Sequence, residues 1–97
     1  MNKYFIDVYL NYKRNWSLRI VEKSDNDTLI SVAWLASFQS TELLNIELSF
    51  YDFPKLSQED IEKRNEAKMI DAVRRYKISK HRAAVLLKTG WELTGPS

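Results

Sequence analysis

The sequence predicts an α+β fold, in which a small antiparallel β-sheet of three or four strands is followed by two C-terminal α-helices. Two observations support this class: apolar residues alternate with polar ones in the first half of the chain, and they recur at helical spacing in the second half. A chain of 97 residues has the size of one domain. We therefore expect a single domain over residues 1–97, strand-rich over 1–54 and helical over 57–90, with the helices on the even-numbered face of the sheet.

The first two strands are predicted by alternation. Every even-numbered residue from Tyr4 to Tyr12 is apolar, whereas the odd-numbered ones include Asp7 and Asn11, as in a half-buried strand. The pattern resumes over residues 16–20 after a short polar connection, so the two runs predict a hairpin.

The next two segments are less uniform. Residues 24–27 are short and polar, which is typical of a turn. Residues 28–38 are apolar on both parities, so they form either a central strand covered on both faces or a short helix. The β-branched residues favour the strand. Residues 44–50 alternate again and predict a further strand that ends near Pro54.

A change of period after Pro54 predicts the helices. Ser57 and Asp60 resemble a capping box, because the hydroxyl of Ser57 can accept from the third backbone amide and early carboxylates suit the positive end of the helix dipole. We expect this helix to run from about Gln58 to Tyr76.

A second helix should follow directly. Ser79 is its expected cap, the helix runs from Lys80 to about Thr89, and Gly90 takes the C-terminal cap position. We expect Trp91 to fold back onto that end.

The predicted core combines even-numbered strand residues with the buried stripes of both helices. Its members are Trp16, Leu18, Ile20, Ile30, Val32, Trp34, Ile46, Leu48, Ile61, Ile70, Val73, Leu86 and Leu87. The odd-numbered face of the sheet would then be uncovered and would present Phe5, Tyr9, Val21 and Tyr51. An exposed apolar patch of this kind makes a homodimer a reasonable hypothesis.

The residue inventory predicts a protein that is not an enzyme. The chain has no cysteine, a single histidine and only two glycines, Gly90 and Gly95, so thiolate metal sites and glycine-rich phosphate loops are excluded. The histidine, His81, lies between Lys80 and Arg82, and the sequence indicates no nucleophile or carboxylate partner for it. We expect no catalytic residues, no metal and no cofactor.

The sequence also predicts a location. Asp7 interrupts what would be the apolar part of a signal peptide, and no apolar run approaches the ~20 residues of a membrane span. We expect a soluble protein of the cytoplasm that does not contact a membrane.

Charge is distributed unevenly along the chain. Residues 22–66 carry a net charge of −6, whereas residues 1–21 carry +3 and residues 67–97 carry +5. Such opposed fields indicate a partner that is recognised through charge. The acidic middle and the basic C-terminal segment also have a simpler interpretation, in which the charges only solvate outer faces and match helix dipoles.

The basic C-terminal stretch resembles the helix-turn-helix of bacterial and phage repressors. Over Met69 to Lys88 the apolar positions that hold such helices together are all filled, by Ala72, Tyr76, Ile78, Ala83 and Leu86. The resemblance places Lys77 in a left-handed turn and puts the second helix in the major groove of DNA. It implies DNA contacts from Arg74, Arg75, Lys80, His81, Arg82 and Lys88.

The acidic middle supports a different hypothesis. Seven carboxylates are expected at strand ends and at one helix start, where they can present spaced negative charges to a basic DNA-binding surface. They are Asp25, Asp27, Glu42, Glu47, Asp52, Glu59 and Asp60. Tyr9, Tyr51 and Phe53 are candidate aromatic anchors for that contact.

In size, in lack of catalytic residues and in patchy charge, the whole chain resembles phage-encoded anti-CRISPR proteins, some of which imitate DNA. The resemblance implies an inhibitor that acts in the host cell cytoplasm and docks on a host nucleic-acid-processing protein or nucleoprotein complex. The alternative hypothesis is a helix-turn-helix DNA-binding regulator.

Overall fold

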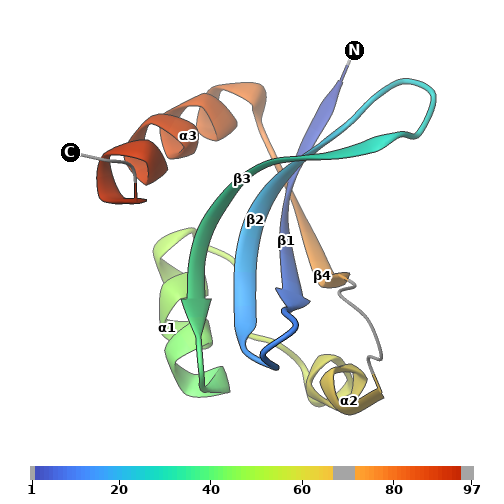
Figure 1. Cartoon of the computed structure of the whole chain (residues 1–97), viewed down its shortest axis with the longest axis vertical. Helices are drawn as coiled ribbons and strands as arrows, with labels where there is room; N and C mark the ends of the chain where they lie inside the picture. Colours follow the sequence, from blue (N-terminus) through green and yellow to red (C-terminus); the bar gives the residue numbers. More distant parts are fainter. Residues whose placement is uncertain (1, 67–71, 95–97) are drawn as a thin grey trace.

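The fold is α+β, as predicted, and the described residues form a four-stranded antiparallel sheet and three helices (Figure 1). The computed structural model describes residues 2–66 and 72–94. Its elements are β1 (Lys3–Leu10), β2 (Trp16–Lys23), β3 (Leu29–Phe38), α1 (Thr41–Phe50), α2 (Gln58–Glu66), β4 (Ala72–Ile78) and α3 (Lys80–Thr94). The strand order is β3-β2-β1-β4, so the last strand in sequence lies beside the first.

The predicted hairpin of β1 and β2 is confirmed. The two strands pair antiparallel from Lys3 opposite Lys23 to Leu10 opposite Trp16. The side chain of Asn11 holds the connecting loop, because its Oδ1 accepts from the backbone N–H groups at positions 13 and 15 at 2.9 and 3.0 Å. The short polar connection therefore forms a turn between the two strands, as its composition predicted.

The third segment is a strand, as favoured, but it is not central. β3 pairs with β2 only and forms one edge of the sheet, with two shifts in register. Ile30, Val32 and Trp34 are 54%, 40% and 49% exposed, so their assignment to the core was wrong. The helices cover the later part of β3, where Leu35 and Phe38 pack against the core.

Residues 44–50 form a helix, so the predicted strand there was wrong. α1 begins after Ser40, whose hydroxyl accepts from the backbone N–H of Leu43 at 3.2 Å. Leu44 and Leu48 are fully buried, whereas Ile46 is 55% exposed. Residues four apart share a helix face and residues two apart do not, so the alternating apolar residues are divided between the core and solvent.

The long helix predicted over residues 58–76 was wrong in its second part. The Ser57–Asp60 capping box is confirmed, since the amide of Asp60 donates to the hydroxyl of Ser57 at 3.2 Å and the carboxylate of Asp60 accepts from the amide of Ser57 at 3.1 Å. The helix nevertheless ends at Glu66, and β4 begins at Ala72. Pairing with β1 satisfies the backbone groups of β4.

The helix-turn-helix prediction is therefore wrong in its architecture. Residues 72–78, which would have formed its first helix, are a strand, and Lys77 has no positive φ. Met69 lies outside the described residues. The physical reason is that alternation across β4 buries Tyr76 and Ile78 on the core side and exposes Lys77 on the other side.

The last helix begins as predicted but ends later. Ser79 caps α3, because its hydroxyl accepts from the backbone N–H of Arg82 at 3.0 Å. The helix continues through Gly90 to Thr94, so the assignment of Gly90 as the C-terminal cap was wrong. The side chain of Trp91 lies outside those described.

The core lies between the helices and one face of the sheet. Trp16 is fully buried at its centre, and its indole N–H donates to the hydroxyl of Thr41 at 3.1 Å. Of the predicted core, Trp16, Leu18, Ile20, Leu48 and Val73 are buried, and Ile61, Leu86 and Leu87 pack against them partly buried. Ile46 is exposed with the β3 residues named above, and Ile70 lies outside the described residues.

Candidate functional site

One face of the sheet packs against the helices, and no described helix packs on the opposite face. The apolar residues of all three helices join the cluster formed by the even-numbered residues of β1 and β2. Residues directly opposite one another in antiparallel strands share a face, so the strand register defines the other side. We call this side the open face; it consists of Lys3, Phe5, Asp7, Tyr9, Ser17, Arg19, Val21, Lys23, Leu29, Ser31, Trp34, Ser37, Ala72, Arg75 and Lys77.

A buried carboxylate lies at the centre of the open face. Asp7 is 0% exposed, and its Oδ2 accepts from Nε and Nη2 of Arg19 at 3.3 and 3.2 Å. Its Oδ1 accepts from Nε of Arg75 at 2.6 Å. The strand order explains the arrangement, because Asp7 on β1 faces Arg19 on β2 and Arg75 on β4. One carboxylate thus fixes two guanidinium groups, and hydrogen bonds between charged groups are the stronger kind.

Both arginine side chains remain partly accessible from solvent. The side chains of Arg19 and Arg75 are 25% and 35% exposed, although the carboxylate between them is covered. Their bonds to Asp7 use Nε of each residue and one terminal nitrogen of Arg19 only. Each arginine therefore keeps N–H donors for a further acceptor.

Aromatic side chains flank this cluster. The guanidinium carbon of Arg19 lies 4.5 Å from the ring centroid of Tyr9, within the range of a cation–π contact. Trp34 on β3 lies opposite Arg19 in the register and is 49% exposed. The row across the four strands therefore reads Trp34, Arg19, Asp7, Arg75.

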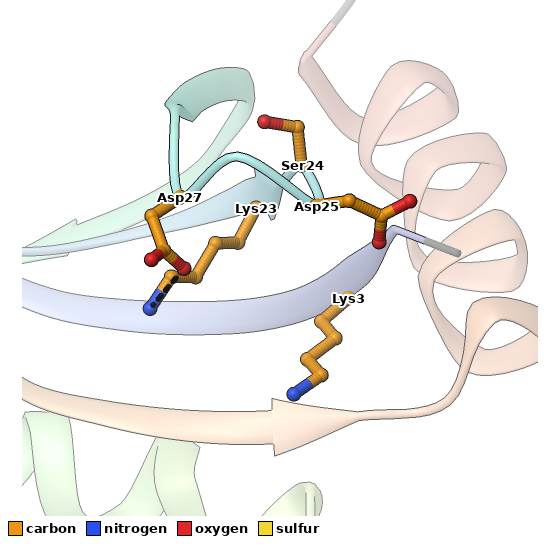
Figure 2. A pocket seen from close by; sticks show the side chains of 5 residues that line it. All are labelled: Lys3, Lys23, Ser24, Asp25 and Asp27. Atoms are coloured by element: carbon orange, nitrogen blue, oxygen red, sulfur yellow. Dashed lines mark ion pairs between the residues drawn. The ribbon is translucent and has the colours of Figure 1, made fainter.

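One end of the open face is a polar hollow. Lys3 and Lys23 lie opposite each other there, and with the turn residues Ser24, Asp25 and Asp27 they line a cavity of about 120 Å³. Figure 2 shows both lysine side chains extending to the same side of their strands. Lys23 forms an exposed ion pair with Asp27 at 3.5 Å. With two lysines and two carboxylates, the hollow itself carries no net charge.

The strand residues of the open face are strongly basic. They carry five cations, Lys3, Arg19, Lys23, Arg75 and Lys77, against one carboxylate, Asp7. That carboxylate is buried, so the charge presented to solvent at these positions is positive. Arginine pairs held in this way suit phosphate oxygens, because the planar guanidinium recognises them through two parallel hydrogen bonds.

The expected description of the odd-numbered face was wrong in detail. Tyr9 and Val21 are buried, at 9% and 2% exposure, and the guanidinium of Arg19 lies over the ring of Tyr9. Tyr51 does not lie on the sheet: it follows α1 and packs against the core on the helical side. Phe53, another expected anchor, stacks on Tyr76 with 4.4 Å between ring centroids.

The predicted acidic surface is divided between two ends of the molecule. Asp25 and Asp27 lie in the turn between β2 and β3, at the opposite end of the sheet from α2 (Figure 1). The other members are Glu42 and Glu47 on α1, Asp52 directly after it, and Glu59 and Asp60 on α2. Three of these five are engaged locally, since Glu47 accepts from the hydroxyl of Tyr51, Glu59 pairs with Lys63 and Asp60 accepts from Ser57.

Asp60 has a structural role in the start of α2. It is 4% exposed and accepts from both the amide and the hydroxyl of Ser57. Burial disfavours the charged form, but these hydrogen bonds, together with the cations Arg74 and Lys63, lower the pKa of Asp60 below its usual value.

The predicted basic residues also lie on different surfaces. Arg75 is on the open face, whereas the adjacent Arg74 projects to the helical side, 5.7 Å from the ring of Tyr76. Lys80, His81, Arg82 and Lys88 all lie on α3. Of these, Arg82 joins α3 to the end of α1. Its Nη2 donates to the carbonyl oxygen of Tyr51 at 2.7 Å, and its guanidinium lies near the rings of Tyr51 and Phe53.

The contacts of Tyr51 give a prediction about pH. Burial, reinforced by the charge of Glu47 and the hydrogen bond to it, raises the pKa of Tyr51 to about 12. The raised pKa means that the folded state keeps this proton when the unfolded state has lost it, so the associated stability is present below pH 10 and is lost as the pH rises towards 12. Titration of tyrosinate absorbance should show a late step that Tyr51→Phe removes. If that variant keeps the step, Tyr51 is not its source.

The described residues hold no group of three histidine, cysteine, aspartate or glutamate side chains arranged to bind a metal ion. None of the described helices combines the length and the apolar character needed to cross a membrane. No protein-family model, no curated protein and no solved structure shows significant similarity to the chain. Proposals about function therefore rest on the site itself.

Sequence reasoning missed the centre of the site. Asp7 was noted only as an interruption of apolar patterns, Arg19 was not singled out, and Arg75 was predicted to contact DNA but from a helix. One signal was available: a hairpin whose loop begins at Asn11 and ends at Asn15, rather than spanning only residues 13–15, places Asp7 opposite Arg19. A charged pair at facing positions on the face away from the core indicates a cross-strand ion pair.

Proposed function

We propose that this protein is a non-enzymatic nucleic-acid-binding protein that contacts the phosphate backbone through its open face. The observation that supports this most is the pair of arginines fixed on one buried carboxylate, with both arginine side chains partly exposed. Arginine is the side chain best suited to phosphate oxygens, and the bonds to Asp7 reduce the conformational freedom that each arginine would lose on binding.

The surrounding residues extend the surface beyond a single phosphate. Lys77 on β4, and Lys3 and Lys23 at the end of the sheet, lie on the same face as the arginines. Strand residues rise about 3.3 Å each, so the step from Asp7 to Lys3 covers roughly 13 Å. A linear polyanion that follows the strands would therefore meet cations along its length.

The inhibitor hypothesis stays a prediction with less geometric support. It requires the acidic residues to act together on a basic groove, whereas Asp25 and Asp27 lie at the other end of the sheet from α2. The basic open face, by contrast, is formed by neighbouring strands, and the buried carboxylate of Asp7 holds two of its arginines together.

Substitution of Lys77 tests the proposal. Lys77→Gln removes one exposed cation of the open face, and we expect weaker binding to nucleic acid with a salt dependence shallower by about 0.7 in the log–log slope, the contribution of one phosphate contact on a single strand. The measurement is fluorescence anisotropy with a labelled oligonucleotide of mixed sequence over a series of salt concentrations.

Arg74→Gln is the matched control, because it removes one cation from the same strand on the opposite side. It should leave the affinity and the slope close to those of the parent protein. Equal losses in both variants would show that binding depends on net charge alone, and absence of binding at low salt would refute the proposal.

A further inference from the structure

We infer that the open face binds single-stranded nucleic acid, with the indole of Trp34 stacked on a base while Arg19 and Arg75 contact phosphates. This inference rests on the proposed function and names the form of nucleic acid that the face is built to bind. It depends on the exposure of Trp34, on its place in the row of charged residues, and on the shape of a sheet surface.

The indole of Trp34 is available in a way that the other described indole is not. Trp16 is fully buried, donates its N–H to Thr41 and has the guanidinium of Arg64 5.3 Å from its ring. Trp34 is half-exposed and has no ring contact and no side-chain hydrogen bond with any described residue. An exposed indole presents a flat apolar surface that a nucleobase can cover.

The position of Trp34 links stacking to charge. Trp34 lies opposite Arg19 in the register, and Arg19 is joined through Asp7 to Arg75. Adjacent strands are about 4.8 Å apart, so Trp34 and Arg75, three strands away in the row, have backbones separated by roughly 14 Å. A single strand can place a base on the indole and its phosphates over the arginines within that span.

The surface suits a single strand better than a duplex. Many proteins that read duplex sequence insert a helix or a two-stranded ribbon into the major groove, whereas the open face is a four-stranded surface. In a duplex the bases are already stacked on one another, so the indole of Trp34 would gain no base to cover. Proteins that bind single strands combine a basic surface with exposed aromatic rings, and this combination is present on the open face.

The same chemistry would serve single-stranded DNA and single-stranded RNA, because both expose base faces and phosphates. The experiment therefore uses three probes of one mixed sequence: a DNA single strand, the corresponding RNA single strand, and the blunt DNA duplex. We expect either single strand to bind at least about tenfold more tightly than the duplex at the same salt concentration.

Two variants of Trp34 separate stacking from folding. Trp34→Ala should weaken single-strand binding about tenfold, the lower part of the range for one base–aromatic stack, and should leave duplex binding unchanged. Trp34→Phe should retain most of the affinity but lose the part of the tryptophan fluorescence quenching that base stacking causes. Phe50→Ala, which truncates an aromatic residue 71% exposed on α1, is the matched control and should leave both measurements unchanged.

The outcomes distinguish the inference from the proposed function. Equal binding of duplex and single strand, or unchanged binding by a folded Trp34→Ala variant, would overturn the inference and leave phosphate binding by the open face in place. Failure to bind any of the three probes at low salt would overturn both.

Discussion

Replacing Asp7 with asparagine should lower the free energy of unfolding by about 3 kcal/mol, the upper range for removing the charged partner of hydrogen-bonded arginines. The carboxylate is fully buried and accepts from two guanidinium groups, so the variant leaves two cations facing each other across β1 without compensation. Denaturation by urea, monitored by circular dichroism, measures the change.

Asp27→Asn is the matched control for that substitution. Asp27 also pairs with a cation, Lys23, but its side chain is 83% exposed, and exposed pairs contribute at most about 1 kcal/mol. In the Asp7→Asn background, Arg75→Gln should cost less than it does alone, because its partner is already absent. Equal costs in both backgrounds would show that Arg75 does not depend on Asp7.

The second large effect is expected in α1. Leu48→Ala should destabilise the protein by about 3 kcal/mol, because it creates a cavity where the side chain is fully buried. Ile46→Ala should change the stability by less than about 0.5 kcal/mol, since Ile46, two residues before Leu48 in the same helix, is 55% exposed. Thermal or urea unfolding of both variants provides the comparison. Similar large losses in the two variants would favour the strand that alternation suggested for this segment.

The parts of the fold that the sequence predicted correctly are those where the local pattern is compatible with only one local structure. The hairpin of β1 and β2 combines alternation with a loop held by Asn11, and both signals lie within neighbouring residues. The capping box of α2 and the Ser79 cap of α3 are likewise local. Such features form from adjacent residues and need no information about the rest of the chain.

The two segments that were given the wrong secondary structure, residues 44–50 and 72–78, were misassigned for different physical reasons. Leu44 and Leu48 lie four residues apart, a spacing that fits one face of a strand and one face of a helix, and the cap at Ser40 was the signal that distinguishes them. Val73 and Tyr76 fit a helical stripe by their spacing of three, but β4 forms because β1 has a free edge for it. Tertiary pairing overrides local preference in such segments.

The site was less predictable than the fold. The cations were visible in the sequence, but their grouping depends on strand order: Arg75 joins Asp7 only because β4 lies beside β1, whereas Arg74 projects to the other side. A shift of register by one residue would exchange their roles. Charge counted along the chain therefore located the basic residues without showing which of them act together.

Because the first and last strands are neighbours in the sheet, the site can form only late in the synthesis of the chain. Asp7 and Arg75 are 68 residues apart, so the bond between them closes a loop that spans most of the chain. Contacts this distant in sequence form late, because they require the entropy of a long loop to be overcome first. During synthesis Asp7 emerges early, with Arg19 but without its second partner. If the open face binds nucleic acid as proposed, binding requires that the C-terminal third of the chain has been made and has joined the sheet, because β4 supplies Arg75.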